Sequence, residues 1–238
     1  MRQILCYAVV LIIVSGLVTT PQAEEKRDIS KILENLRKHR LERIEQFKKE
    51  NLELKTTVFL GDSLTEGFDL KKFFPELKAV NRGIVADHIG VQGKDGVLQR
   101  LDNSVFDCNP TRVVLMIGVN DIGDDDHNPE LMAQGFREII ETIRKHDPRI
   151  TVYVQSCLPT GGKYARLNPM IVEFNKSIES IAEETLSVYV NVHPLFADEK
   201  GELIPELTRE GLHLTPRGYE VWAAELRKVL DIPSPELP

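Results

Sequence analysis

The feature that most constrains the fold is a set of five short apolar segments that alternate with segments of helical pattern. The apolar segments lie at residues 56–61, 78–81, 111–118, 150–156 and 187–192. The helical patterns lie at residues 88–102, 130–146, 168–185 and 216–230. Strands that alternate with helices and are apolar throughout are typical of a parallel sheet covered on both faces. We therefore predict one three-layer α/β domain with a central parallel sheet of about five strands.

Flanking segments surround this domain, which we place at residues 56–231. A length of 238 residues favours a single folded domain. Residues 24–55 carry apolar side chains at helical spacing amid charge, so we expect an amphipathic helix there. Residues 232–238 contain three prolines and are expected to form an irregular tail.

The first 23 residues differ in kind from the rest. Arg2 precedes an apolar run over residues 4–18, and Ala23 stands just before a charged segment. This order is typical of a secretory signal peptide, and the run is short for a bilayer span. Pro21 occupies a position where a small residue is usual, so an uncleaved membrane anchor stays as the alternative. We predict an exported protein, periplasmic or secreted, without stable membrane contact once the leader is removed.

The net charge of the chain limits the kinds of molecule that it can be expected to bind. Lys and Arg number 30 and Asp and Glu 37, a net charge of −7. An acidic chain repels phosphate backbones, so we do not expect nucleic-acid binding. The expected partner is a small-molecule or carbohydrate ester, and the oligomeric state is left open.

Two cysteines fall inside the predicted domain. Cys108 precedes one predicted strand and Cys157 follows another. Strands that run parallel would place the two thiols at opposite edges of the sheet, beyond the reach of a disulfide. We expect two buried free thiols.

The polar residues just past the strands are the candidates for chemistry, because ligands bind at the carboxyl ends of the strands in such sheets. Ser63 follows the first strand in a glycine-flanked turn, Gly83 follows the second, and Asn120 follows the third. Each also has a plain structural reading: Asp62 or Ser63 could cap a helix, and glycine and asparagine are common in turns. Taken together, they suggest a serine hydroxyl next to donors of the kind that form oxyanion holes.

A histidine near the end of the chain could activate this serine. His213 lies just before the last helical pattern, three residues after Glu210. A carboxylate at this spacing can accept the imidazole N–H and leave the other ring nitrogen to take a serine proton.

Metal and cofactor chemistry find less support in the sequence. The acidic run at residues 124–127 lacks the alternating ligand spacing of a calcium loop, and we interpret it as a solvated turn. No glycine-rich phosphate loop is present. We expect neither a metal nor a cofactor.

Four motifs together resemble the SGNH (GDSL) hydrolase family. They are GDSLTEG from residue 61, NRG from residue 81, GVND from residue 118 and EGLH from residue 210. The similarity covers about residues 56–230 and is strongest to the single-domain branch that resembles the acetylhydrolase subunits acting on platelet-activating factor. It implies a flavodoxin-like sheet and no cofactor.

The resemblance also implies roles for individual residues. Ser63 would be the nucleophile and His213 the base, while the Ser63 and Gly83 N–H groups and the Asn120 side chain would form the oxyanion hole. The sequence departs from the family at two positions. Glu210 stands where an Asp is usual, and Ala86 stands where a second glycine often follows the NRG segment.

These features predict an esterase that hydrolyses short-chain acyl esters, above all acetyl esters, through an acyl-enzyme. Asp62 and Tyr164, the latter in the loop between Cys157 and Asn168, are expected to contact substrate. Two alternatives stay open. One is a lysophospholipase or thioesterase acting on longer acyl chains; the other is a weakly active carbohydrate-binding protein on an esterase scaffold.

Overall fold

A computed structural model describes residues 22–51 and 57–233 of the chain. Most of the predicted leader at residues 1–23, and most of the predicted tail, lie outside these residues. The boundaries proposed from the sequence therefore stay predictions. None of the described helices is long and apolar enough to cross a membrane.

The centre of the molecule is a five-stranded sheet in which all the strands are parallel, as predicted. The order is β2-β1-β3-β4-β5, which is the flavodoxin-like order. The strands are β1 Thr57–Gly61, β2 Ala79–Gly83, β3 Arg112–Met116, β4 Thr151–Gln155 and β5 Val188–Val190. β1 pairs with both β2 and β3, and Gly61 lies level with Gly83 and Met116. The carboxyl ends of the three strands that precede the candidate residues therefore meet at one edge.

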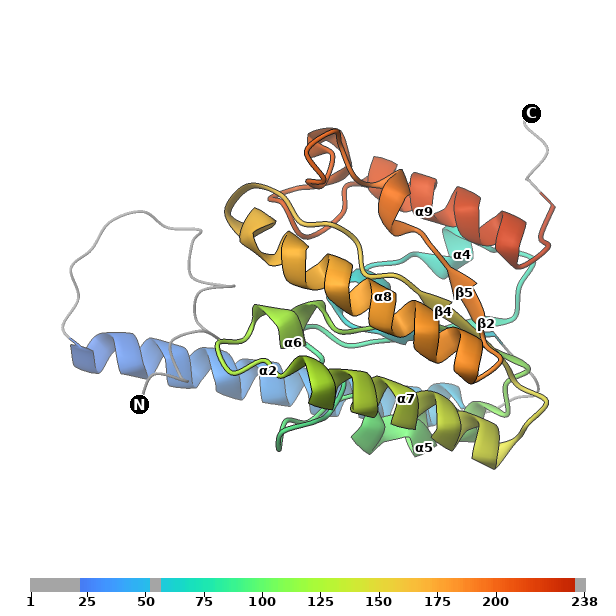
Figure 1. The fold of residues 1–238 in the computed structure, drawn as a ribbon. Helices are drawn as coiled ribbons and strands as arrows, with labels where there is room; N and C mark the ends of the chain where they lie inside the picture. Colours follow the sequence, from blue (N-terminus) through green and yellow to red (C-terminus); the bar gives the residue numbers. More distant parts are fainter. Residues whose placement is uncertain (1–21, 52–56, 234–238) are drawn as a thin grey trace.

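Helices cover both faces of the sheet, which gives the three layers (Figure 1). Val58 and Leu60 belong to a core with α7 and α8, whereas Phe59 belongs to a core with α9. The α-helices are α2 Gln22–Glu50, α3 Ser63–Glu66, α4 Leu70–Phe73, α5 Leu101–Ser104, α6 Val119–Gly123, α7 Pro129–His146, α8 Asn168–Glu184 and α9 Pro216–Val229. Short 3₁₀ helices occur at η1 Leu98–Arg100, η2 Phe106–Cys108, η3 Gly162–Leu167, η4 His193–Leu195 and η5 Pro205–Leu207.

Helix α2 packs beside the edge strand β2. Its C-terminal half is anchored by Phe47, which is fully buried, and by Arg43, which donates to the carbonyl oxygens of Asn81 and Gly83. Its N-terminal half projects beyond the other helices in Figure 1.

The helix predicted over residues 88–102 is wrong for most of its length. Only η1 and α5 form at its end, and residues 84–97 are a loop. Gly90 and Gly93 have φ values of 104° and 73°, which lie outside the right-handed helical region. Gly96 packs so tightly that an added Cβ would lie 2.3 Å from the backbone nitrogen of Gly90.

Both cysteines of the domain are buried and carry free thiols. This agrees with the expectation from their positions relative to the strands.

Candidate active site

Ser63 lies where β1 passes directly into α3. Gly61 permits this tight connection, because an added Cβ would lie 2.2 Å from the carbonyl oxygen of Met116. Asp62 caps α3 by accepting a hydrogen bond of 2.9 Å from the Leu64 N–H. The Ser63 hydroxyl is thereby held at the carboxyl edge of the sheet. Its own N–H finds no acceptor in residues 22–51 and 57–233.

His213, 150 positions along the chain from Ser63, contacts the serine hydroxyl. Ser63 Oγ lies 3.0 Å from His213 Nε2. Glu210 Oε1 contacts His213 Nδ1 and also accepts from the His213 backbone N–H at 3.2 Å. A carboxylate can only accept, so Nδ1 carries the proton and Nε2 accepts from the serine hydroxyl. The structure thus brings Ser63, His213 and Glu210 into one hydrogen-bonded line.

The loop that carries Glu210 and His213 is fixed by its own hydrogen bonds. Thr208 Oγ1 donates to the His213 carbonyl at 2.9 Å and accepts from the Gly211 N–H at 2.8 Å. Gly211 has φ +96°, and an added Cβ would lie 2.2 Å from the carbonyl oxygen of Gly161. Glycine is therefore required there on two counts, and it lets the loop fold so that Glu210 meets His213.

Asn120 lies in the first turn of α6, just past the carboxyl end of β3. Its Nδ2 donates to the Asp87 carbonyl at 2.8 Å. An amide nitrogen has two hydrogens, so one N–H is left for a further acceptor.

The predicted oxyanion-hole role of Gly83 needs correction. The Gly83 N–H already donates to Asn81 Oδ1 at 2.9 Å. Gly83 serves close packing instead, since an added Cβ would lie 2.1 Å from the Glu66 backbone nitrogen. The sequence could not show this, because it does not reveal how a backbone N–H is used.

Three residues further on, Ala86 offers a free donor. Its φ is +57°, which is uncommon for a residue with a Cβ. The flanking N–H groups are occupied: Val85 donates to Glu66 Oε2 at 2.7 Å, and Asp87 donates to the Ile84 carbonyl at 3.2 Å. The Ala86 N–H has no acceptor in the part of the chain that the structure describes.

The two predicted substrate contacts are both buried. Asp62 is 1% exposed, and burial raises the pKa of its carboxyl to about 7. Its Oδ2 has no hydrogen-bond partner among the described residues. Tyr164 is 7% exposed and packs in the core that contains α7 and α8. Neither side chain is open to solvent, and their contact with substrate stays a prediction.

A cavity of about 10 Å³ is lined by the residues that flank Ser63 in the sequence and by the residue that precedes His213. It is close to the size of a single water molecule. Its walls are formed by Asp62, Leu64, Met116, Val119, Cys157, Leu158, Pro159, Thr160 and Leu212.

A buried ionic group that was not expected from the sequence lies beneath the site. Asp87 Oδ2 accepts from Arg100, whose Nε lies at 2.8 Å, and Asp87 Oδ1 pairs with Arg40 of α2. Arg100 also donates to the Gly61 carbonyl at 3.0 Å, at the end of β1. A lone Arg or Asp in a sequence gives no sign of such pairing. No local signal marks these residues, since charge near the NRG segment is no denser than in the chain as a whole.

The acidic run at residues 124–127 forms ion pairs instead of a metal site. Lys94 Nζ lies 2.6 Å from Asp124 Oδ2 and 2.8 Å from Asp126 Oδ1. Among the described residues, no group of three or more His, Cys, Asp or Glu side chains is arranged to hold a metal ion.

Comparison with known proteins relates this site to acylhydrolases. The sequence profile of the GDSL-like Lipase/Acylhydrolase family matches residues 59–221. The platelet-activating factor acetylhydrolase IB subunit alpha1 of Rattus norvegicus is 28% identical over 183 residues, which cover 73% of this chain and 74% of that protein.

Solved structures show the same fold. A protein from Streptococcus pneumonia that is described as a platelet activating factor has a TM-score of 0.76 at 27% identity, covering 84% of this chain and 97% of that chain. Axe2, an acetylxylan esterase from Geobacillus stearothermophilus, has a TM-score of 0.62 at 19% identity, covering 75% of this chain and 95% of that chain.

Proposed function

Because this chain belongs to the GDSL-like lipase/acylhydrolase family, we propose that it is a serine esterase that removes short acyl groups, above all acetyl, through an acyl-enzyme. The observation that carries the proposal is the line from Ser63 Oγ to His213 Nε2 at 3.0 Å, continued from His213 Nδ1 to Glu210. It is the arrangement that a serine needs in order to lose its proton as it attacks a carbonyl.

In the acylation step, Ser63 Oγ attacks the ester carbonyl while His213 Nε2 takes the hydroxyl proton. Glu210 holds the Nδ1–H and stabilises the imidazolium that forms. His213 then gives the proton to the leaving alcohol. Water, deprotonated by the same nitrogen, releases the acid from the serine.

The charge that develops on the carbonyl oxygen needs donors that are fixed in advance. The free N–H groups of Ser63 and Ala86 and the unused N–H of Asn120 are the three that we assign. Each donor contributes on the order of 3 kcal/mol to the stability of the transition state when its geometry is right. Ala86 thus takes the place that the sequence suggested for Gly83.

The preference for a short acyl group rests on the small cavity that is lined by sequence neighbours of Ser63 and His213. Leu64 and Leu212, neighbours in sequence of Ser63 and His213, form part of its wall. A space of about 10 Å³ admits one water-sized group, so a long acyl chain that entered it would have to displace buried side chains. The names of two similar proteins, an acetylhydrolase and an acetylxylan esterase, agree with acetyl.

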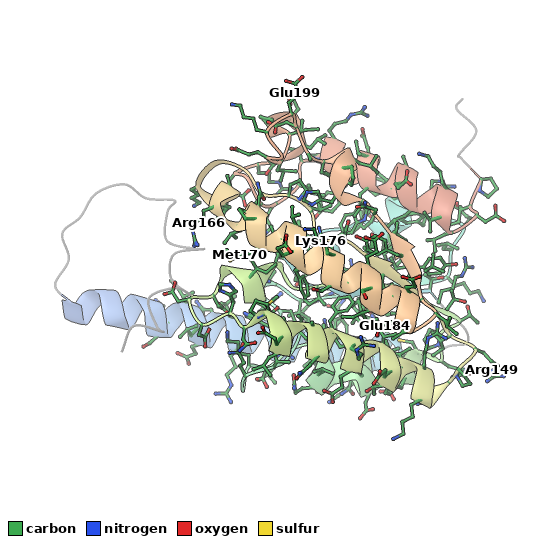
Figure 2. All side chains as sticks on the ribbon, viewed as in Figure 1. Arg149, Arg166, Met170, Lys176, Glu184 and Glu199 are labelled. Atoms are coloured by element: carbon green, nitrogen blue, oxygen red, sulfur yellow. The ribbon has the colours of Figure 1, made fainter. Side chains whose placement is uncertain are left out.

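Longer acyl chains are the second candidate, and one observation favours them. An apolar groove of about 440 Å³ lies between α7 and α8, next to α6. Met170, in the first turn of α8 (Figure 2), forms part of its wall with Ile122, Met132 and Phe174. A weakly active carbohydrate-binding protein has less support, because the residue that suggested it, Glu210, contacts His213.

A panel of p-nitrophenyl esters of increasing acyl length, with acetylated xylan alongside, separates these functions. The small cavity predicts a kcat/KM that is greatest for acetate and falls steadily with chain length. A kcat/KM that is greatest for octanoate or a longer ester would indicate that the acyl chain binds in the groove between α7 and α8. Cleavage of none of them by the wild-type protein would contradict the esterase.

A further inference from the structure

Helix α2 forms one wall of the turn that carries Ala86, although it lies outside the range matched by the family profile. Arg40 pairs with Asp87 Oδ1 and donates to the Gly96 carbonyl at 2.9 Å. It therefore joins α2 to both ends of the loop between β2 and η1.

Asp87 connects Arg40 to the proposed oxyanion hole. Its carboxylate is fully buried between Arg40 of α2 and Arg100, whose Nη2 lies 2.6 Å from Oδ2. The carbonyl of the same residue accepts from Asn120 Nδ2. Asp87 is thus the residue through which Arg40 can fix both the Asn120 amide and the peptide group next to Ala86.

A second contact from α2 holds the other side of the turn. His39 Nε2 lies 2.9 Å from Glu66 Oε1, and Glu66 Oε2 accepts from the Val85 N–H at 2.7 Å. Glu66 belongs to α3, the helix that begins at Ser63. The residues before and after Ala86 are therefore both tied, directly or through Glu66, to α2.

This double attachment matters because Ala86 is held in a left-handed conformation. A residue with a Cβ stays at φ +57° only where its surroundings fix it. When one attachment is lost, the turn can relax so that Ala86 adopts a negative φ. The Ala86 N–H then no longer points towards the position of the oxyanion.

We propose that Arg40 is a positioning residue for catalysis, which holds Ala86 and Asn120 in the geometry of the oxyanion hole through Asp87. This role rests on the proposed esterase function. Catalysis then depends on α2. The side chain responsible, Arg40, lies about 20 residues before the range matched by the family profile.

The test compares Arg40→Met with Arg37→Met, an exposed arginine one turn earlier on the same helix. In the full chain, Arg40→Met is expected to lower kcat for p-nitrophenyl acetate by roughly ten- to hundredfold, with KM changed by less than about threefold. Arg37→Met is expected to keep both constants. Circular dichroism and a thermal melt check that both variants are folded at the assay temperature. If Arg40→Met melts below it, Arg40→Lys replaces it, with the same direction of effect.

A second substitution separates positioning from general stability. Ala86→Gly removes the strain of the left-handed conformation, so it is expected to raise kcat several-fold more in the Arg40→Met background than in the wild-type background. Equal effects of Ala86→Gly in the two backgrounds, or a folded Arg40→Met with wild-type kcat, would overturn the role of Arg40. Those outcomes leave Ser63-dependent hydrolysis by the wild-type protein intact. A wild-type protein without such hydrolysis would instead overturn the proposed function, and this role with it.

Discussion

Glu210 holds His213 by two hydrogen bonds at once, one at the ring and one at the backbone. Its Oε1 contacts Nδ1 and accepts from the His213 N–H at 3.2 Å. The family resemblance implies an aspartate at this position, and the longer glutamate reaches the ring because the loop folds back at Gly211. The same oxygen thus fixes the loop and the tautomer of the histidine.

This relationship predicts a large effect of Glu210→Gln on turnover. An amide can present its NH₂ group to Nδ1 and so stabilise the tautomer that cannot accept the serine proton. We expect kcat to fall by roughly a hundredfold or more, while the circular dichroism spectrum stays that of the wild type. Glu206→Gln is the matched control, since Glu206 is an exposed glutamate in η5, four positions before Glu210. A Glu210→Gln variant with more than half of the wild-type kcat would show that another acceptor orients His213.

The packing of Gly83 predicts a loss of stability. An alanine Cβ there would lie 2.1 Å from the Glu66 backbone nitrogen and 2.7 Å from the Thr65 carbonyl carbon, so α3 or β2 has to move. We expect Gly83→Ala to lower the free energy of unfolding by at least about 2 kcal/mol, as measured by denaturant titration. Gly123→Ala is the control, because its added Cβ meets no atom within 4 Å. Unchanged stability in Gly83→Ala would mean that β2 and α3 are not packed as described.

Asp62 predicts a pH dependence of stability. Burial raises its pKa from 3.8 to about 7 in the folded protein. The folded state therefore binds the proton more tightly than the unfolded state does, and the free energy of unfolding falls as the pH rises from about 4 to about 7. Asp62→Asn can still cap α3 through its amide oxygen, and it removes this titration.

The measurement is the difference in the free energy of unfolding between wild type and Asp62→Asn at pH 5 and at pH 8. We expect this difference to shift in favour of the variant at pH 8 by on the order of 1–4 kcal/mol. Taking the difference removes the contribution of carboxyl groups that do not interact with Asp62. If the difference in the free energy of unfolding between the two proteins is the same at pH 5 and pH 8, Asp62 does not have a raised pKa in the folded protein.

Export is a proposal from the sequence, since the segment concerned lies outside the described residues. We expect mass spectrometry of the exported protein to find a mature N-terminus close to residue 24. Leu11→Arg interrupts the apolar run and is expected to leave the chain at full length in the cell. An exported wild-type protein that keeps Met1 would favour the uncleaved anchor.

The sheet and the line of Ser63, His213 and Glu210 could be predicted because their signals are local. An apolar run marks each strand, and the polar residue that follows it must lie at the carboxyl edge. Ser63 and Asn120 lie where this rule puts them, whereas His213 was singled out by its spacing from Glu210 just before the last helix. The failures depend on information that is not local.

Gly83 illustrates the limit most clearly. Its place at the carboxyl end of the second strand was predicted, but its N–H donates to the side chain of Asn81, two residues earlier. The helix expected over residues 88–102 was predicted from apolar spacing alone. Gly90 and Gly93, which disfavour a helix, were given too little weight. The pair Arg40 and Asp87 could not be foreseen, since 47 positions separate them and only the packing of α2 brings them together.

The central claim is that Ser63 carries the acyl group. Wild-type protein is mixed with p-nitrophenyl acetate, quenched in acid within the first turnovers, digested and analysed by mass spectrometry. We expect a single added acetyl group on the peptide that contains Ser63, a burst of p-nitrophenol of about one equivalent per protein, and neither signal in Ser63→Ala. An acetyl group on another residue, or near wild-type turnover by Ser63→Ala, would contradict it.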